Sequence, residues 1–132
     1  MALTAFLDTN VLVRHLTGDP PEMAARATKA LAGGELLLLA DLVLAECVCV
    51  LESFYEVERV RIAEMMRAAI ALRSIEVVDE AMLLRALEVY EVERLDFADA
   101  YLVAAAETTG VGAVMSFDRG IDRVATVSRI EP

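Results

Sequence analysis

Short apolar runs alternate with segments of helical period along almost the whole chain, and this alternation constrains the fold most. The apolar runs are the predicted strands, at Leu3–Leu7, Leu36–Leu39, Ile75–Val78, Ala113–Phe117 and Thr126–Ile130. Apolar strands separated by helices favour parallel pairing, with helices covering both faces of a sheet. The sequence therefore predicts an α/β fold whose mainly parallel central sheet has about five short strands.

The helices between these strands begin and end at recognisable residues. Gly18 and Gly110 follow two of them, in the position where a left-handed residue commonly ends a helix. Pro20 and Pro21 suit the first turn of another helix, and Asp41 is predicted to cap the helix that follows the second strand. These signals fix the order of the elements along the chain.

Length and composition favour one packed domain spanning residues 1–132. The chain is 58% apolar and 26% charged, which is typical of a globular protein, and it shows no linker or repeat. The first residues lack the basic and apolar regions of an export signal, so a cytoplasmic location is expected. The longest apolar segment, Leu36–Leu51, is interrupted by Asp41 and Glu46 and is too short for a membrane span.

Two acids follow predicted strands. Asp8 comes directly after the first strand and Asp118 directly after Ala113–Phe117. In open parallel sheets, ligands bind beyond the carboxyl ends of the strands, so these carboxylates are candidates for a site at that edge. The structural alternative is that each aspartate caps a turn or a helix, which is a common role for Asp at such junctions.

Two further acids interrupt apolar helices. Glu46 lies in Leu42–Leu51, where no polar face is visible, and the segment is predicted to be buried on all sides. Asp99 interrupts an apolar helix that begins near Asp96. A buried carboxylate is costly unless a cation accompanies it, although Glu46 could reach water at a helix end and Asp96 with Asp99 could form a capping box.

Taken together, the four acids indicate a metal site. Hard divalent cations such as Mg²⁺ require oxygen ligands, and neighbouring carboxylates repel one another unless a cation lies among them. Such sites carry out phosphoryl displacement by activating water and stabilising the leaving oxygen. The single histidine and the closely spaced Cys47 and Cys49 offer little material for imidazole or thiol catalysis.

The acids also lie in recognisable motifs. The segments Leu7-Asp8-Thr9-Asn10-Val11-Leu12, Leu44-Ala45-Glu46, Phe97-Ala98-Asp99-Ala100 and Ser116-Phe117-Asp118-Arg119 resemble the four acidic motifs of PIN domains, in their order and spacing. The resemblance covers essentially the whole chain. It is closest to the VapC-like ribonuclease toxins of type II toxin–antitoxin pairs.

This resemblance implies a doubly wound α/β fold, endonucleolytic cleavage of RNA with Mg²⁺ or Mn²⁺, a homodimer, and inhibition by a cognate antitoxin protein. It implies that Asp8, Glu46, Asp99 and Asp118 are the catalytic metal ligands. Asn10 and Ser116 match the accompanying polar positions. Gly120 stands where many relatives carry an acid, and Asp122 is then a candidate for an additional ligand.

The net charge of −10 requires a source of positive charge if the substrate is RNA, which is a polyanion. Divalent cations, local arginines or a basic segment of the antitoxin could each supply it. Arg94, Arg119 and Arg123 lie near the predicted site in the sequence and are candidates for contact with RNA phosphates.

Two other functions fit the same plan less well. Haloacid-dehalogenase-like phosphatases and response-regulator receivers also place acids after a first strand, but they normally need a late lysine, and the single lysine here is Lys29. A PIN-like binding or interaction module that has lost turnover is the second alternative, and the presence of all four motif acids argues against it.

Overall fold

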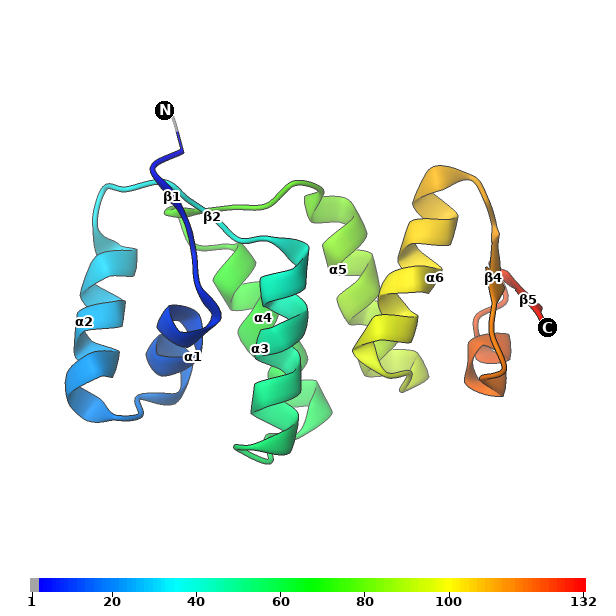
Figure 1. Ribbon diagram of the computed structural model, residues 1–132, viewed down its shortest axis with the longest axis horizontal. Coiled ribbons are helices and arrows are strands. Elements are labelled where there is room, and N and C mark those ends of the chain that lie inside the picture. The colour runs from blue at the N-terminus through cyan, green and yellow to red at the C-terminus, as the bar shows by residue number, and fades with distance from the viewer. Residues whose placement is uncertain (1–2) are drawn as a thin grey trace. The chain divides into compact units, whose positions relative to one another are not determined.

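The computed structural model describes residues 3–132 and divides into two compact units, a first unit that ends at Val78 and a second that runs from Asp79 to Pro132. Each unit is described by itself below, with the elements labelled as in Figure 1.

The first unit contains three strands and four helices. They are β1 (Ala5–Phe6), α1 (Thr9–Thr17), α2 (Pro21–Ala32), β2 (Leu37–Leu38), α3 (Asp41–Ser53), α4 (Arg59–Ile70) and β3 (Ile75–Glu76). The strands form one parallel sheet in the order β1-β2-β3, with Ala5 opposite Leu37 and Leu37 opposite Ile75. Helices α1 and α2 lie side by side (Figure 1).

Local signals explain most helix ends in this unit. Gly18 ends α1 in the left-handed conformation, at φ 72°, and its amide donates to the Arg14 carbonyl. Pro21 is the first residue of α2, where its missing N–H costs nothing. Asp41 differs from the prediction, because Ala40 holds the cap position of α3 and Asp41 is the first helical residue.

The core of the first unit lies under the inner faces of its helices. The side chains of Leu12, Leu44, Leu51, Ile62 and Met66 are fully buried, and burying a side chain of this size stabilises the fold by about 1.5–3 kcal/mol. The prediction that helix α3 is buried on all sides is wrong. Leu42 is 76% exposed, and Glu46 and Cys49 are exposed on the same side of the helix. An all-apolar sequence therefore does not show how many neighbours a helix has.

The second unit contains two strands, two α-helices and two short irregular helices. They are α5 (Glu80–Glu88), the π-helix η1 (Val89–Glu93), α6 (Phe97–Thr109), β4 (Ala113–Met115), the 3-10 helix η2 (Arg119–Arg123) and β5 (Ser128–Ile130). Helices α5 and α6 pack side by side over buried Leu83, Leu87 and Val103 (Figure 1). Strands β4 and β5 pair in parallel, with Ala113 opposite Ser128.

The α/β class predicted from the sequence is confirmed. Within residues 3–132, the five short strands are all paired in parallel, three in the first unit and two in the second. The strands are shorter than the apolar runs that predicted them, and the two irregular helices were not predicted. Within residues 3–132, no helix combines the length and the apolar character needed to span a bilayer.

Candidate active site

Asp8 occupies the junction that the sequence analysis proposed. The amide of Leu7 donates to the Leu38 carbonyl at 2.9 Å, which carries the β1 pairing up to the residue before Asp8. Asp8 holds the cap position of α1 but its side chain accepts no capping hydrogen bond. At the start of α5, by contrast, Asp79 accepts a hydrogen bond from the Met82 amide at 3.0 Å. The exposed carboxylate of Asp8 is therefore not engaged in capping.

Glu46 is held by a hydroxyl from the first helix. The Thr9 Oγ1 donates to Glu46 Oε2 at 2.5 Å, and Thr9 itself is buried, with 7% of its surface exposed. This bond connects α1 to α3 across 37 positions of the sequence. Sequence reasoning did not single out Thr9, although its place directly after Asp8 in a buried helix start was the available signal.

Asp8 and Glu46 also act on the same buried thiol. Cys47 is fully buried, and its pKa is raised to about 12 by burial first and then by the negative charges of Glu46 and Asp8. A thiol with so high a pKa stays protonated and unreactive at neutral pH. Asp8, Glu46 and Thr9 are called the first acid group below.

Asp99 and Asp118 are hydrogen-bonded to each other in the second unit. The pKa of Asp99 is raised by burial, by its hydrogen bond with the Asp118 side chain, and by the negative charges of Asp118 and Asp96. The pKa of Asp118 is lowered by the Gly120 amide first, then by its bond with Asp99 and by the charges of Arg123 and Arg129. Asp99 and Asp118 are called the second acid pair.

Asp99 and Asp118 differ in whether they cap a helix. Asp96 holds the cap position of α6 and its side chain accepts no capping hydrogen bond, so the suggested capping box with Asp99 is absent. Asp118 does cap: its Oδ1 accepts from the Gly120 amide at 2.8 Å at the start of η2. One oxygen of Asp118 therefore has a structural role, whereas Asp99 is directed to Asp118.

Neighbouring residues orient Asp118. The Ser116 Oγ accepts a hydrogen bond from the Asp118 amide at 2.9 Å, so Ser116 shapes the backbone at this position. Asp122, the candidate additional ligand, accepts from Arg129 Nε at 3.1 Å in an ion pair. Arg129, which sequence reasoning missed, thus neutralises Asp122 and also acts on Asp118.

The arginines proposed to contact RNA differ in their surroundings. Arg123 Nη1 donates to the Glu93 carbonyl at 3.1 Å, which ties η2 to the end of η1. Arg94 ends η1 in the left-handed conformation at φ 59°, and Arg119 begins η2; both are exposed. Asn10 is exposed in the first turn of α1.

The acids fit a hard divalent cation in chemistry, since each offers carboxylate oxygens, and the bond between Asp99 and Asp118 shows the crowding of charge that a cation relieves. Among residues 3–132, no group of three or more His, Cys, Asp or Glu side chains is arranged to hold a metal ion. Each unit contributes one set of two acids.

Comparison with known protein families gave a match. The family model described as the PIN domain matches residues 5–127, which is nearly the entire chain and includes all four motif acids. A search of curated proteins gave no match.

Proposed function

Because the chain belongs to the PIN domain family, whose members are generally nucleases, we propose that it is a metal-dependent endoribonuclease that uses Asp8, Glu46, Asp99 and Asp118. The observation that carries this proposal is the second acid pair. Burial, and then the hydrogen bond with Asp118, raises the pKa of Asp99, whereas the Gly120 amide, and then the same bond, lowers the pKa of Asp118. Paired carboxylates with opposed pKa shifts cluster at functional sites.

The proposed ligands of Mg²⁺ or Mn²⁺ are the four motif acids. When bound, such an ion supplies activation of water and stabilisation of charge at the leaving oxygen. The chain's own residues prepare the ligands: the Thr9 hydroxyl orients Glu46, and the Gly120 amide orients Asp118. Asp122 is less suited as an additional ligand, because it forms an ion pair with Arg129.

The finer biological role proposed is that of a VapC-like toxin acting in the cytoplasm. With a net charge of −10, the chain suits a partner with a basic segment, as a cognate antitoxin would provide. A short adjacent reading frame that encodes a DNA-binding module with a basic tail would supply the partner to test. Its co-expression is expected to abolish cleavage.

A homodimer is proposed as well. Large apolar side chains lie exposed on the first unit, among them Leu42 at 76% and Phe54 at 75%. A second copy would remove such side chains from water. Light scattering is expected to give a mass of twice 14.4 kDa, and a species of 14.4 kDa alone would contradict the dimer.

The nuclease proposal is tested with the full chain, free of any antitoxin, on single-stranded and structured RNA. Cleavage is expected with added Mg²⁺ or Mn²⁺ and not with EDTA. Asp8→Asn is expected to lower the rate by more than about 100-fold, because a lost ligand should cost more than a lost outer partner of a ligand. Asp79→Asn is the matched control, since it makes the same charge change and Asn caps a helix as well as Asp does.

Cleavage that survives EDTA, or that Asp8→Asn leaves at the rate of the Asp79→Asn control, would contradict the assignment. Binding of RNA without cleavage by the native chain would favour the alternative of a PIN-like module without turnover.

A further inference from the structure

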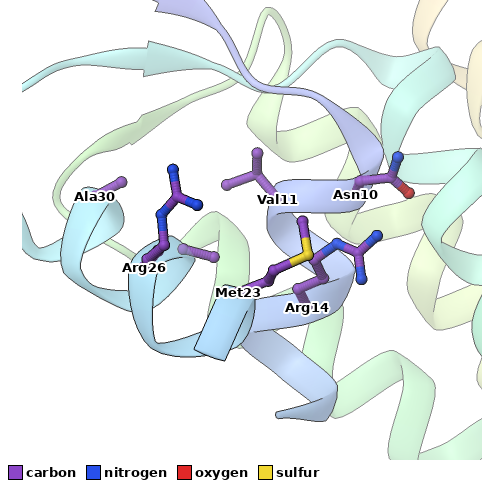
Figure 2. Close-up of a pocket in the computed structure, with 7 residues that line it drawn as sticks. Asn10, Val11, Arg14, Met23, Arg26 and Ala30 are labelled. Carbon is purple, nitrogen blue, oxygen red and sulfur yellow. The ribbon is translucent and has the colours of Figure 1, made fainter. Parts of the chain in front are cut away.

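A groove lies between α1 and α2 in the first unit. Its volume is about 310 Å³, at the lower end of the usual range for ligand pockets. Its lining residues are Asn10, Val11, Arg14, Met23, Arg26, Ala27 and Ala30. In Figure 2, Met23 is drawn between Arg14 and Arg26. The groove thus combines an apolar floor with two guanidinium groups.

Arg14 and Arg26 have no acidic partner within residues 3–132, a feature that they share with Arg73, Arg94 and Arg119, but they are the two that line this groove. Arg61 pairs with Glu64, Arg85 with Glu107, and Arg129 with Asp122. No ion pair or hydrogen bond engages the side chain of Arg14 or Arg26 in the same part of the chain. Two uncompensated cations at one groove are notable in a chain of net charge −10, because acids are plentiful enough to pair with them.

The groove begins next to the first acid group. Asn10 lines it and lies two residues after Asp8, and Arg14 follows Asn10 by one turn of α1. Asn10 and Arg14 also line a second hollow of about 280 Å³, which includes Asp19, Val50 and Phe54. A ligand at Asp8 and Asn10 could therefore continue along the helix to Arg14.

The walls of the groove are fixed to each other. His15 Nδ1 and Thr28 Oγ1 form a hydrogen bond of 2.8 Å between α1 and α2. Ala24, Ala27 and Leu31 are buried on the inner side of α2. The spacing of the two helices is thus set before any ligand binds, which lowers the entropic cost of binding.

We propose that this groove binds the RNA strand next to the position of cleavage, with Arg14 and Arg26 contacting phosphates and Met23 and Val11 contacting a base or ribose. The proposal rests on the proposed function and identifies where its substrate would be held. Guanidinium groups suit phosphate because they donate two hydrogen bonds in a planar fork.

The positive charge of Arg14 and Arg26 favours RNA over a basic protein segment as the occupant of the groove. A basic antitoxin segment would be repelled by the two arginines, whereas a polyanion is attracted to them. The apolar side chains offer no donor or acceptor to read a base, so this contact is expected to tolerate any sequence.

The test measures the binding of a fluorescein-labelled single-stranded RNA in Mg²⁺ by anisotropy over a range of salt concentrations. The full chain carries Asp99→Asn, so that bound RNA stays intact. Adding R14A and R26A is expected to weaken binding at low salt about tenfold. It is also expected to reduce the slope of log affinity against log salt by about 1.4, which is about 0.7 for each lost phosphate contact.

R61A with R73A is the matched control, because it removes the same charge from the first unit outside the groove, and it is expected to change the salt slope by much less. R14K with R26K is expected to restore most of the slope, which shows that charge and not folding is responsible. A slope that R14A with R26A changes no more than the control would overturn the proposal.

Failure of this proposal is distinguishable from failure of the proposed function. A native chain that cleaves RNA but whose salt slope is indifferent to Arg14 and Arg26 refutes the groove alone. A native chain that cleaves nothing refutes the nuclease, while the salt slope still reports on the groove.

Discussion

The two units hold their acids by different means. In the first acid group, a neutral hydroxyl donates to Glu46, and the Asp8 side chain takes no part in capping. In the second acid pair, the two carboxyl groups are hydrogen-bonded to each other, and the Gly120 amide and two arginines lower the pKa of Asp118. A hydroxyl group donates its own proton to a carboxylate, whereas a hydrogen bond between two carboxyl groups requires a proton on one of them.

The difference teaches which acids a cation would affect most. The second acid pair must lose its shared proton before both members can bind a cation, because a bridging proton and a cation compete for the same oxygens. The predictions below test this contrast, beginning with the largest effect.

Thr9→Val tests whether a hydroxyl holds the first acid group in position. Val replaces Thr at nearly the same volume but cannot donate to Glu46. We expect cleavage and metal affinity to fall by about 10- to 100-fold, the usual cost of losing an outer partner of a metal ligand. The cleavage rate as a function of Mg²⁺ concentration measures both.

Two variants control for a general effect on folding. Thr9→Ser retains the hydroxyl and is expected to recover most of the activity. Thr17→Val removes a hydroxyl that donates only to the Val13 carbonyl of its own helix, and it is expected to leave activity unchanged. Equal losses in Thr9→Val and Thr17→Val would show that Glu46 does not depend on Thr9.

Asp99→Asn tests the crowding of charge in the second acid pair. An amide at position 99 can still donate to Asp118, but it carries no charge beside Asp118 and Asp96. We expect the free energy of unfolding of the metal-free protein to rise by about 1 kcal/mol, as is common when a functional site is relieved of strain. Urea denaturation in EDTA at neutral pH measures this change.

Asp8→Asn gives the comparison, because no hydrogen bond joins Asp8 to another carboxyl group within residues 3–132. It is expected to change stability by a few tenths of a kcal/mol at most, as surface substitutions do. If Asp99→Asn destabilises the protein instead, the bond between Asp99 and Asp118 supports the fold and the contrast between the units is wrong.

The same contrast explains how much could be predicted from the sequence. Gly18, Pro21 and Gly110 marked helix ends correctly because each acts through its own backbone. The prediction that α3 is buried on all sides was wrong, because exposure depends on which elements pack against each side of the helix. An apolar sequence does not show which elements those are. Local features such as helix ends can be predicted from the sequence, whereas packing between distant segments cannot.

The candidate site divides in the same way. Its acids are candidates that the sequence itself offers, because a carboxylate in an apolar helix or after a strand is visible there. The hydrogen bond of Thr9 could not be predicted, since its acceptor, Glu46, is 37 positions away, and the place of Thr9 directly after Asp8 was the only sign of a role. The ion pair of Asp122 with Arg129 also escaped prediction, because the pair forms only when β5 lies against η2.

The smallest effect concerns an ion pair with a structural role in the second unit. Glu107 accepts from Arg85 Nε at 2.8 Å and from Nη2 at 2.9 Å, and Thr126 donates to the same carboxylate. The Arg85 bonds are the main reason that the pKa of Glu107 lies below its ordinary value of 4.5. Glu107→Gln is expected to lower the free energy of unfolding by about 0.5–1 kcal/mol, because both side chains remain partly exposed to solvent.

This loss has a defined dependence on pH. A carboxyl group whose pKa is lower in the folded state stabilises the fold above its unfolded pKa, and that contribution disappears as the pH falls through the folded pKa. The difference in melting temperature between the native chain and Glu107→Gln is therefore expected to be constant near neutral pH and to shrink below about pH 4.5. Glu64→Gln, which breaks the exposed pair with Arg61, should show almost no difference at any pH. A gap for Glu107→Gln that persists in acid would show that packing around position 107, and not charge, stabilises the contact between α5 and α6.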